Sequence, residues 1–213
     1  ARNALTLVEA NGAGVVRLAG VNNQATTFKT AHANALIRVA NNGTLTGNVD
    51  ATVAGGKLRF DGAGQVTGTI GATNPLDEVL ANGAGVVNLG NAIDTATLNV
   101  KSGAIVKAAD KSAAAIAAIN LGTAGVGGGT LVIDAGGGNY DLLNGTAITF
   151  LHADSLLKLT NTTNAGNRTV TLNADLAPGG GADLIGSLEI NSAGTKTLNV
   201  AVNIAETIGT DKT

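Results

Sequence analysis

Short runs of alternating hydrophobic and polar residues recur along this 213-residue chain. The run ANGAGVVRL at 10–18 returns almost unchanged as ANGAGVVNL at 81–89. A weaker copy, SLLKL at 155–159, follows GVVNL at 85–89 after nearly the same interval. In an extended chain Val16 and Leu18 point to one side and Arg17 to the other, and the later copies repeat this pattern. Each copy therefore predicts a half-buried strand, and the recurrence indicates a repeat protein.

Other segments follow in the same order, which supports the repeat. ALIRVANNG at 35–43 is matched by AIVKAADKS at 104–112, and GKLRFDGAG from position 56 is matched by GTLVIDAGG from position 129. The third block keeps this order at first and then loses about one short coil. We predict that residues 1–213 form one structural segment. Within it we distinguish three sequence blocks, at about 5–74, 75–145 and 146–213.

Several short strands per block, roughly 20 to 25 residues apart, are typical of about three coils of a solenoid. We predict an all-β fold, a right-handed parallel β-helix (β-solenoid) of about nine rungs, roughly 40 Å long at the usual strand spacing. An antiparallel β-sandwich also has many short strands separated by turns. It is less favoured because sandwich strands do not normally recur at a long fixed period and sandwich cores usually contain aromatic residues.

The amino-acid composition limits the kind of core and the classes of function that the chain can have. The chain has three Phe, one Tyr and no Trp, so the core must be narrow and aliphatic, and 31 Gly together with many Asn suit its corners. Charged residues make up 13% and the net charge is −2, which disfavours nucleic-acid binding and attraction to an anionic bilayer. Without Cys there are no disulfides, thiolate metal sites or Cys nucleophiles.

No segment is expected to insert into a membrane. The longest apolar run, at 113–119, is far shorter than the roughly 20 residues that a membrane-spanning helix needs. The chain does not start with Met and carries no pattern of a signal peptide, so we expect it to be an internal segment of a longer protein.

One stretch leaves two secondary structures open. Residues 111–121, KSAAAIAAINL, are rich in Ala, which favours a helix by intrinsic propensity. Short isolated helices are marginal in water without packing, so a non-helical segment is an equal alternative. A helix there would be an excursion from the solenoid.

The candidates for catalysis are few. His32 and His152 are the only histidines, and neither has a Ser, Cys or carboxylate partner at a spacing that suggests a triad. We interpret both as polar turn residues. The acids mostly follow strands, where Asp hydrogen-bonds its own turn. They are Asp50, Asp61, Asp94, Asp110, Asp134 and Asp154. Sugar-stacking aromatics are nearly absent, so we predict no enzyme and no catalytic residues.

Glycine-rich stretches suggest metal or phosphate sites only superficially. GGGNYDLL at 136–143 resembles one calcium-binding nonapeptide of secreted toxins, but such sites need tandem copies to complete the oxygen ligands, and no second copy stands nearby. No Lys-Ser/Thr follows residues 125–129, and residues 12–14 lack the third Gly of a phosphate-binding loop. We interpret all three as turns or corners and predict no metal and no cofactor.

Five basic residues are expected to point outward from strands and are the candidate partner-binding residues. They are Arg17, Arg38, Arg59, Lys107 and Lys158. Single charges on strands also have an ordinary role, because they keep the lateral faces soluble and discourage sideways pairing.

The repeats NGAGVVNLGN and GTLTGNVDATVAGGKLRFDGAGQVTGTIG, at 82–91 and 43–71, stand in a chain rich in Gly, Asn, Thr and Ala, without Cys and with few aromatics. In this the chain resembles the passenger domains of bacterial autotransporters, and among them the rickettsial surface cell antigens, outer membrane proteins A and B. The likeness extends over essentially all 213 residues and lies in texture and short repeats. It implies a parent protein with an N-terminal signal and a C-terminal β-barrel anchor, exported to the bacterial surface.

The resemblance implies an adhesin or invasin that attaches bacteria to host cells, with a host cell-surface protein as partner. The alternative is a structural stalk or surface coat without direct receptor binding, and a polysaccharide-active β-helix enzyme is a distant third. The open ends of a solenoid expose unpaired strand edges, so end-to-end self-association is also expected of the isolated segment.

Overall fold

The computed structural model describes residues 5–53, 55–108, 116–134, 146–161, 168–172, 175–178, 186–192 and 198–202. Every regular element among these residues is a β-strand. The strands are β1 (Leu5–Ala10), β2 (Val15–Leu18), β3 (Asn22–Thr30), β4 (Leu36–Val39), β5 (Gly43–Ala51), β6 (Lys57–Phe60), β7 (Gly64–Val66), β8 (Leu76–Ala81), β9 (Gly85–Leu89), β10 (Thr95–Val100), β11 (Ala104–Ala108), β12 (Ile116–Leu121), β13 (Thr130–Asp134), β14 (Ala147–Phe150), β15 (Leu156–Asn161), β16 (Arg168–Leu172), β17 (Asp175–Pro178), β18 (Ser187–Ser192) and β19 (Leu198–Val202).

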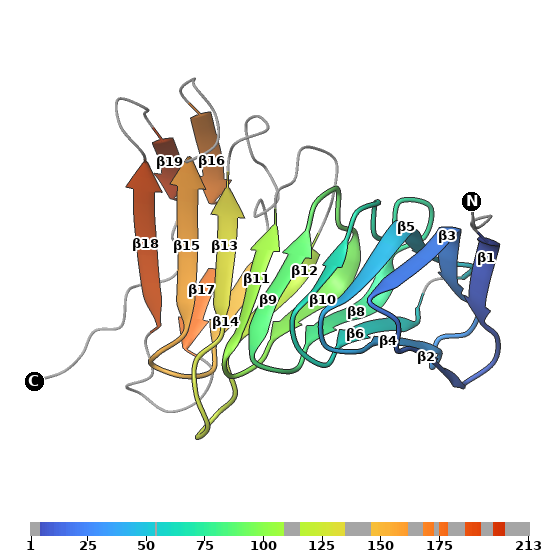
Figure 1. The fold of residues 1–213 in the computed structure, drawn as a ribbon. Helices are drawn as coiled ribbons and strands as arrows, with labels where there is room; N and C mark the ends of the chain where they lie inside the picture. The colour runs from blue at the N-terminus through green and yellow to red at the C-terminus, as the bar shows by residue number, and fades with distance from the viewer. Residues whose placement is uncertain are drawn as a thin grey trace, which may run out of the picture.

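Successive strands alternate between two sheets (Figure 1). Sheet A has nine strands in the order β1-β3-β5-β7-β9-β11-β13-β15-β18, and sheet B has eight in the order β17-β14-β12-β10-β8-β6-β4-β2. β16 and β19 form a separate pair. All strand pairings within these sheets are parallel, which confirms the predicted parallel β-solenoid and excludes the antiparallel sandwich. The run from β1 to β12 makes about six turns, one strand to each sheet per turn.

The long sequence repeat does not return the chain to the same sheet. One turn is much shorter than the repeat, because Leu36 of β4 pairs with Val15 of β2 and with Lys57 of β6. The two valines of the first copy lie in β2 of sheet B, whereas those of the second lie in β9 of sheet A, three and a half turns later. Both halves of a turn need one strand and one corner, so either sheet accepts the same sequence.

The core lies between the sheets and follows the predicted alternation. Val87 and Leu89 are buried while Asn88 between them is exposed, and Leu157 and Leu159 repeat this pattern one block later. The core is mostly aliphatic, as predicted, but it also holds three Phe side chains: Phe28, Phe60 and Phe150. A ring fits at position 60 because the facing strand has Gly64, where a Cβ would lie only 2.6 Å from the Phe60 Cδ1 atom.

The sequence left a helix and a non-helical segment equally open at 111–121. Residues 116–121 of this stretch form strand β12. β12 pairs in parallel with β10 and β14, so its backbone groups bond between strands. Ile116, Ile119 and Leu121 are buried in the core, and this tertiary packing outweighs the helix propensity of the Ala-rich sequence. Residues 111–115 lie outside the described part of the chain.

Gly and Asn occupy the corners, as expected. Asn42 and Gly12 have positive φ values of 62° and 76°. Asn side chains also link successive turns: Asn41 Oδ1 accepts from the Ala63 amide at 2.9 Å, and Asn48 Oδ1 accepts from the Thr69 amide at 3.0 Å. These bonds hold successive turns in register along the solenoid.

Candidate functional site

Arg17, Arg38 and Arg59 form one column on the outer face of sheet B, called the arginine column here. They occupy the same position of β2, β4 and β6: Arg17 is paired with Arg38, and Arg38 with Arg59. The segments VVRL, LIRV and KLRF each place Arg between two inward-facing hydrophobic residues. Adjacent strands lie about 4.8 Å apart, so three guanidinium groups follow one another on consecutive turns.

A single carboxylate bridges two members of the column. Arg59 Nε donates a 2.9 Å hydrogen bond to Asp61 Oδ1, and Arg38 Nε donates to Asp61 Oδ2. Burial raises the pKa of Asp61, but hydrogen bonds and charge from Arg38 and Arg59 outweigh it and hold the pKa below its usual value of 3.8. Arg17 is exposed, and it forms no ion pair with any carboxylate of the described residues.

Beyond the arginine column, the outer face of sheet B changes from charged to neutral. Lys57 Nζ lies 3.2 Å from Glu78 Oε2, and Glu78 Oε1 accepts a 2.6 Å hydrogen bond from Asn99 Nδ2. Asn120 Nδ2 then donates to Asn99 Oδ1 at 2.9 Å. Stacked charges thus give way to a ladder of amides, which satisfies its own donors and acceptors along the axis.

Lys107 and Lys158 lie on the outer face of the other sheet, away from the arginine column. Both belong to one column of sheet A, but Val132 of β13 stands between them. Lys158 Nζ pairs with Glu189 Oε1 at 2.6 Å, whereas Lys107 is exposed. The five predicted partner-binding residues therefore form two sets on two sheets and not one patch.

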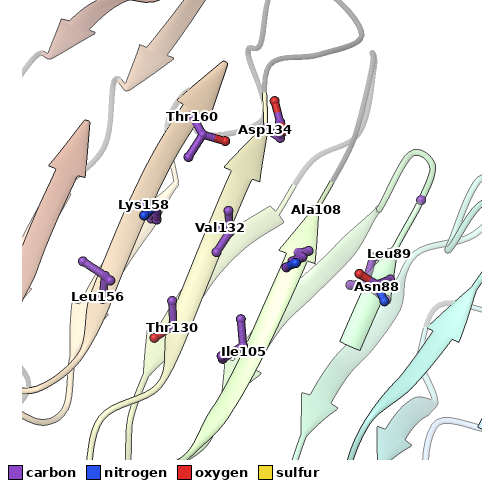
Figure 2. Close-up of a pocket in the computed structure, with 12 residues that line it drawn as sticks. Asn88, Leu89, Ile105, Ala108, Thr130, Val132, Asp134, Leu156, Lys158 and Thr160 are labelled. Atoms are coloured by element: carbon purple, nitrogen blue, oxygen red, sulfur yellow. The ribbon is translucent and has the colours of Figure 1, made fainter. Parts of the chain in front are cut away.

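A shallow depression of about 740 Å³ surrounds these lysines on sheet A (Figure 2). Residues of β9, β11, β13 and β15 line it, and its apolar part comes from Ile105, Val132 and Leu156. Its lining mixes aliphatic side chains with two ammonium groups and the carboxylate of Asp134, and could contact an amphipathic partner. Sequence reasoning missed this feature, although its signal is visible: aliphatic residues stand at outward positions of LVID and LLKL, where polar residues are usual.

Both histidines serve as turn residues, in agreement with the sequence interpretation. His32 Nδ1 accepts a 3.0 Å hydrogen bond from the Asn34 amide, and His152 Nδ1 accepts one of 3.1 Å from the Asp154 amide. Each turn is closed by a backbone bond to the histidine carbonyl, from Ala35 and from Ser155. HANA and HADS are therefore the same turn used at two corners.

The described aspartates are spread along the rod, and two of them make bonds beyond their own turn: Asp61, which bonds the two arginines, and Asp50. Asp50 is buried, and its Oδ1 accepts not only from the Ala51 amide but also from the amides of Thr73 and Asn74 on the next turn. Asp50 therefore links its own turn to the next one. Burial raises the pKa of Asp94 above its usual value. Asp110 lies outside the described residues.

One of the Gly-rich stretches forms a corner of the solenoid. In the 125–129 stretch the Gly127 amide donates back to the Thr123 carbonyl at 3.2 Å, so the loop closes on itself as a corner. The calcium-like motif at 136–143 lies outside the described residues. Among those that are described, no group of three or more His, Cys, Asp or Glu side chains could hold a metal ion.

Comparisons with known proteins add no relative: no family model, curated protein or solved structure matches this chain. No helix long and apolar enough to cross a membrane occurs in the part of the chain that the structure describes.

Proposed function

We propose that this chain is a surface-exposed passenger segment of a bacterial autotransporter adhesin or invasin, a right-handed β-helix of about nine rungs that attaches bacteria to host cells. The observation that carries the proposal is a parallel solenoid whose outer faces present unevenly distributed charges, above all Arg17, which pairs with no described carboxylate. Nine strands in sheet A support the number of rungs. Right-handedness is supported by the strong general preference for right-handed crossovers between parallel strands.

The assignment of the chain to the cell surface, without enzymatic activity, rests on its resemblance to passenger domains and on this rod-like architecture. A solenoid holds residues of successive turns on one long lateral face, which suits contact with an extended partner. The proposed partner is a molecule of the host cell surface, and the parent protein supplies export and anchoring.

The second candidate function is a stalk or coat segment, and one observation favours it. Several charges of the described faces are neutralised within the face, by Arg38 and Arg59 with Asp61, Lys57 with Glu78, and Lys158 with Glu189. Internally paired charges keep a lateral face soluble and prevent sideways strand pairing without engaging a receptor.

Binding of the labelled, purified chain to cultured host cells separates the two candidates. An adhesin gives saturable binding that excess unlabelled chain competes away, whereas a stalk or coat binds no better than an unrelated passenger segment. The assay needs monodisperse protein, because the terminal strands expose hydrophobic side chains, with Leu5 59% and Ile190 50% exposed. End-to-end association through these strands, checked by light scattering after gel filtration, would otherwise imitate tight binding.

A further inference from the structure

We propose that the arginine column binds a linear anionic polysaccharide, sulfated or carboxylated. This names the class of ligand for the adhesion described above and rests on that proposed function. The site consists of Arg17, Arg38 and Arg59, with Asp61 as an internal counter-charge.

The column has a surplus of positive charge that the described residues of its own face do not neutralise. Three guanidinium groups share one carboxylate, because Asp61 bonds both Arg38 and Arg59. The nearby Lys57 is already matched by Glu78. In a chain with net charge −2, this leaves a local net of two positive charges (three less one) at the β2 end of sheet B.

The geometry suits a ligand with repeated anionic groups. The in-register pairing holds the three arginines in a straight row, with Arg17 and Arg59 about 9.6 Å apart along the axis at the usual strand spacing. Guanidinium groups bind sulfate and carboxylate through two parallel N–H donors, so a row of them recognises a row of such anions. Asp61 orients two of the three side chains and reduces the ordering cost on binding.

Other anionic partners fit less well. Proteins that bind single-stranded nucleic acid usually stack bases on aromatic side chains, and the aromatic residue nearest the column in sequence, Phe60, is fully buried. An acidic protein would need large anchors such as Trp or Tyr at the centre of its interface, and the strand positions beside the column supply only the aliphatic Val15, Leu36 and Leu80. Affinity must therefore come from repeated charge, which a polysaccharide provides.

The test measures binding of heparin, hyaluronan and a single-stranded oligonucleotide to the full chain at low salt and at about 0.15 M salt, where exposed charges are partly screened. The key variant is Arg17→Gln, and its matched control is Lys107→Gln, which removes an exposed cation from sheet A. We expect Arg17→Gln to weaken heparin binding about fivefold and Lys107→Gln less than about twofold. Heparin and hyaluronan separate sulfated from carboxylated ligands, and binding of either supports the proposal.

Asp61→Asn gives a result in the opposite direction that a purely structural role would not produce. It removes the only carboxylate of the site, so the column gains net positive charge. We expect this gain to outweigh the lost ordering of Arg38 and Arg59, so that binding tightens about threefold. The measurement is made well below the melting temperature of this variant. If Asp61→Asn does not fold, the comparison of Arg17→Gln with Lys107→Gln still shows whether the polysaccharide binds at the arginine column.

Three results would overturn the proposal: no binding of either polysaccharide at low salt, equal losses in Arg17→Gln and Lys107→Gln, or an oligonucleotide that binds as tightly as the better polysaccharide. The proposed adhesion fails separately. Absence of saturable cell binding with intact heparin binding would refute the adhesin and leave the polysaccharide site. Intact cell binding by an Arg17→Gln chain that no longer binds heparin would refute the site as the adhesion contact.

Discussion

The outer faces of the two sheets differ in how they accommodate charged side chains on successive turns. On sheet B, arginines occupy three consecutive turns, and one carboxylate, Asp61, bridges two of them. On sheet A, the two lysines of one column are separated by Val132, and Lys158 has its own partner in Glu189.

The difference shows a cost that is inherent in a repeated sequence. Parallel in-register pairing places equivalent residues of successive turns next to each other, so a repeated cation becomes a like-charge pair, which is destabilising. Such a column is stable with an acid between its members or with a neutral residue inserted. On sheet B, Asp61 is the acid, and Arg17 is the one arginine of the column that it does not bind. On sheet A, Val132 is the inserted neutral residue.

The largest expected effect tests whether both faces depend on the core behind them. Phe60 lies directly before Asp61 and is fully buried, and Leu159 holds the corresponding place after Lys158. Because truncation leaves a cavity, Phe60→Ala should cost about 4 kcal/mol and Leu159→Ala about 3 kcal/mol of unfolding free energy. Denaturant titration followed by circular dichroism measures both. Losses below about 1 kcal/mol would mean that the core does not support these faces as described.

The next effect tests the backbone of sheet A against that of a corner. Gly47 of sheet A has φ +138° and stands opposite a bulge of β3, where a Cβ would lie 1.8 Å from the Ala25 carbonyl oxygen. Gly47→Ala should therefore destabilise the chain by about 3 kcal/mol, through strain and a clash with backbone. Gly12→Ala is the control, since Gly12 also has positive φ but nothing within 4 Å of its Cβ position, and it should cost only about 1 kcal/mol. Equal melting temperatures for the two variants would contradict the close approach at the bulge.

Asp61→Asn breaks the comparison between the faces directly. Two charge-assisted hydrogen bonds weaken, so the variant should lose about 1 kcal/mol at pH 7, more than the Glu189→Gln variant of sheet A. Since the folded state holds the pKa of Asp61 below 3.8, the stabilisation is complete above that value and disappears as the pH falls through the folded-state pKa. Melting curves from pH 7 to pH 2 should show wild type and Asp61→Asn converging; a constant difference would contradict the bridge.

Asp94 should behave in the opposite sense and with the smallest effect. Burial raises its pKa in the folded state, so the ionised carboxylate opposes folding above that pKa, and stability is recovered as the pH falls below it. Asp94→Asn should stabilise the chain at pH 7 by well under about 1 kcal/mol, with the gain vanishing in acid. A destabilised Asp94→Asn variant at pH 7 would show that the carboxylate accepts bonds that outweigh its burial.

Much of the fold could be predicted from periodicity alone. The alternation in GVVNL and SLLKL indicated which side chains are buried, because alternation is a local property of a strand. The recurrence of these runs indicated a solenoid, because it can be found by comparing segments of the sequence. The sheet to which each copy belongs could not be predicted. The interval between the copies fits whole turns or half turns until the register is known, and β2 and β9 prove to lie on opposite sheets.

The candidate site was only half visible in the sequence. Arg17, Arg38 and Arg59 are evenly spaced along the chain, so their column could have been found once that spacing was taken as the length of one turn. The lysine column could not be predicted in this way, because the turns from Lys107 to Val132 and from Val132 to Lys158 are longer than those of the arginine column. Likewise, the packing that makes residues 116–121 a strand depends on β10 and β14, far from them in sequence.

The most direct test of the account is to compare host-cell binding by the wild-type chain with that of Arg17→Gln and Lys107→Gln, at equal concentration and after gel filtration. The account predicts saturable, competable binding by wild type, a clear loss of about threefold or more for Arg17→Gln, and little change for Lys107→Gln. Binding that does not saturate, or that both variants weaken equally, would contradict it.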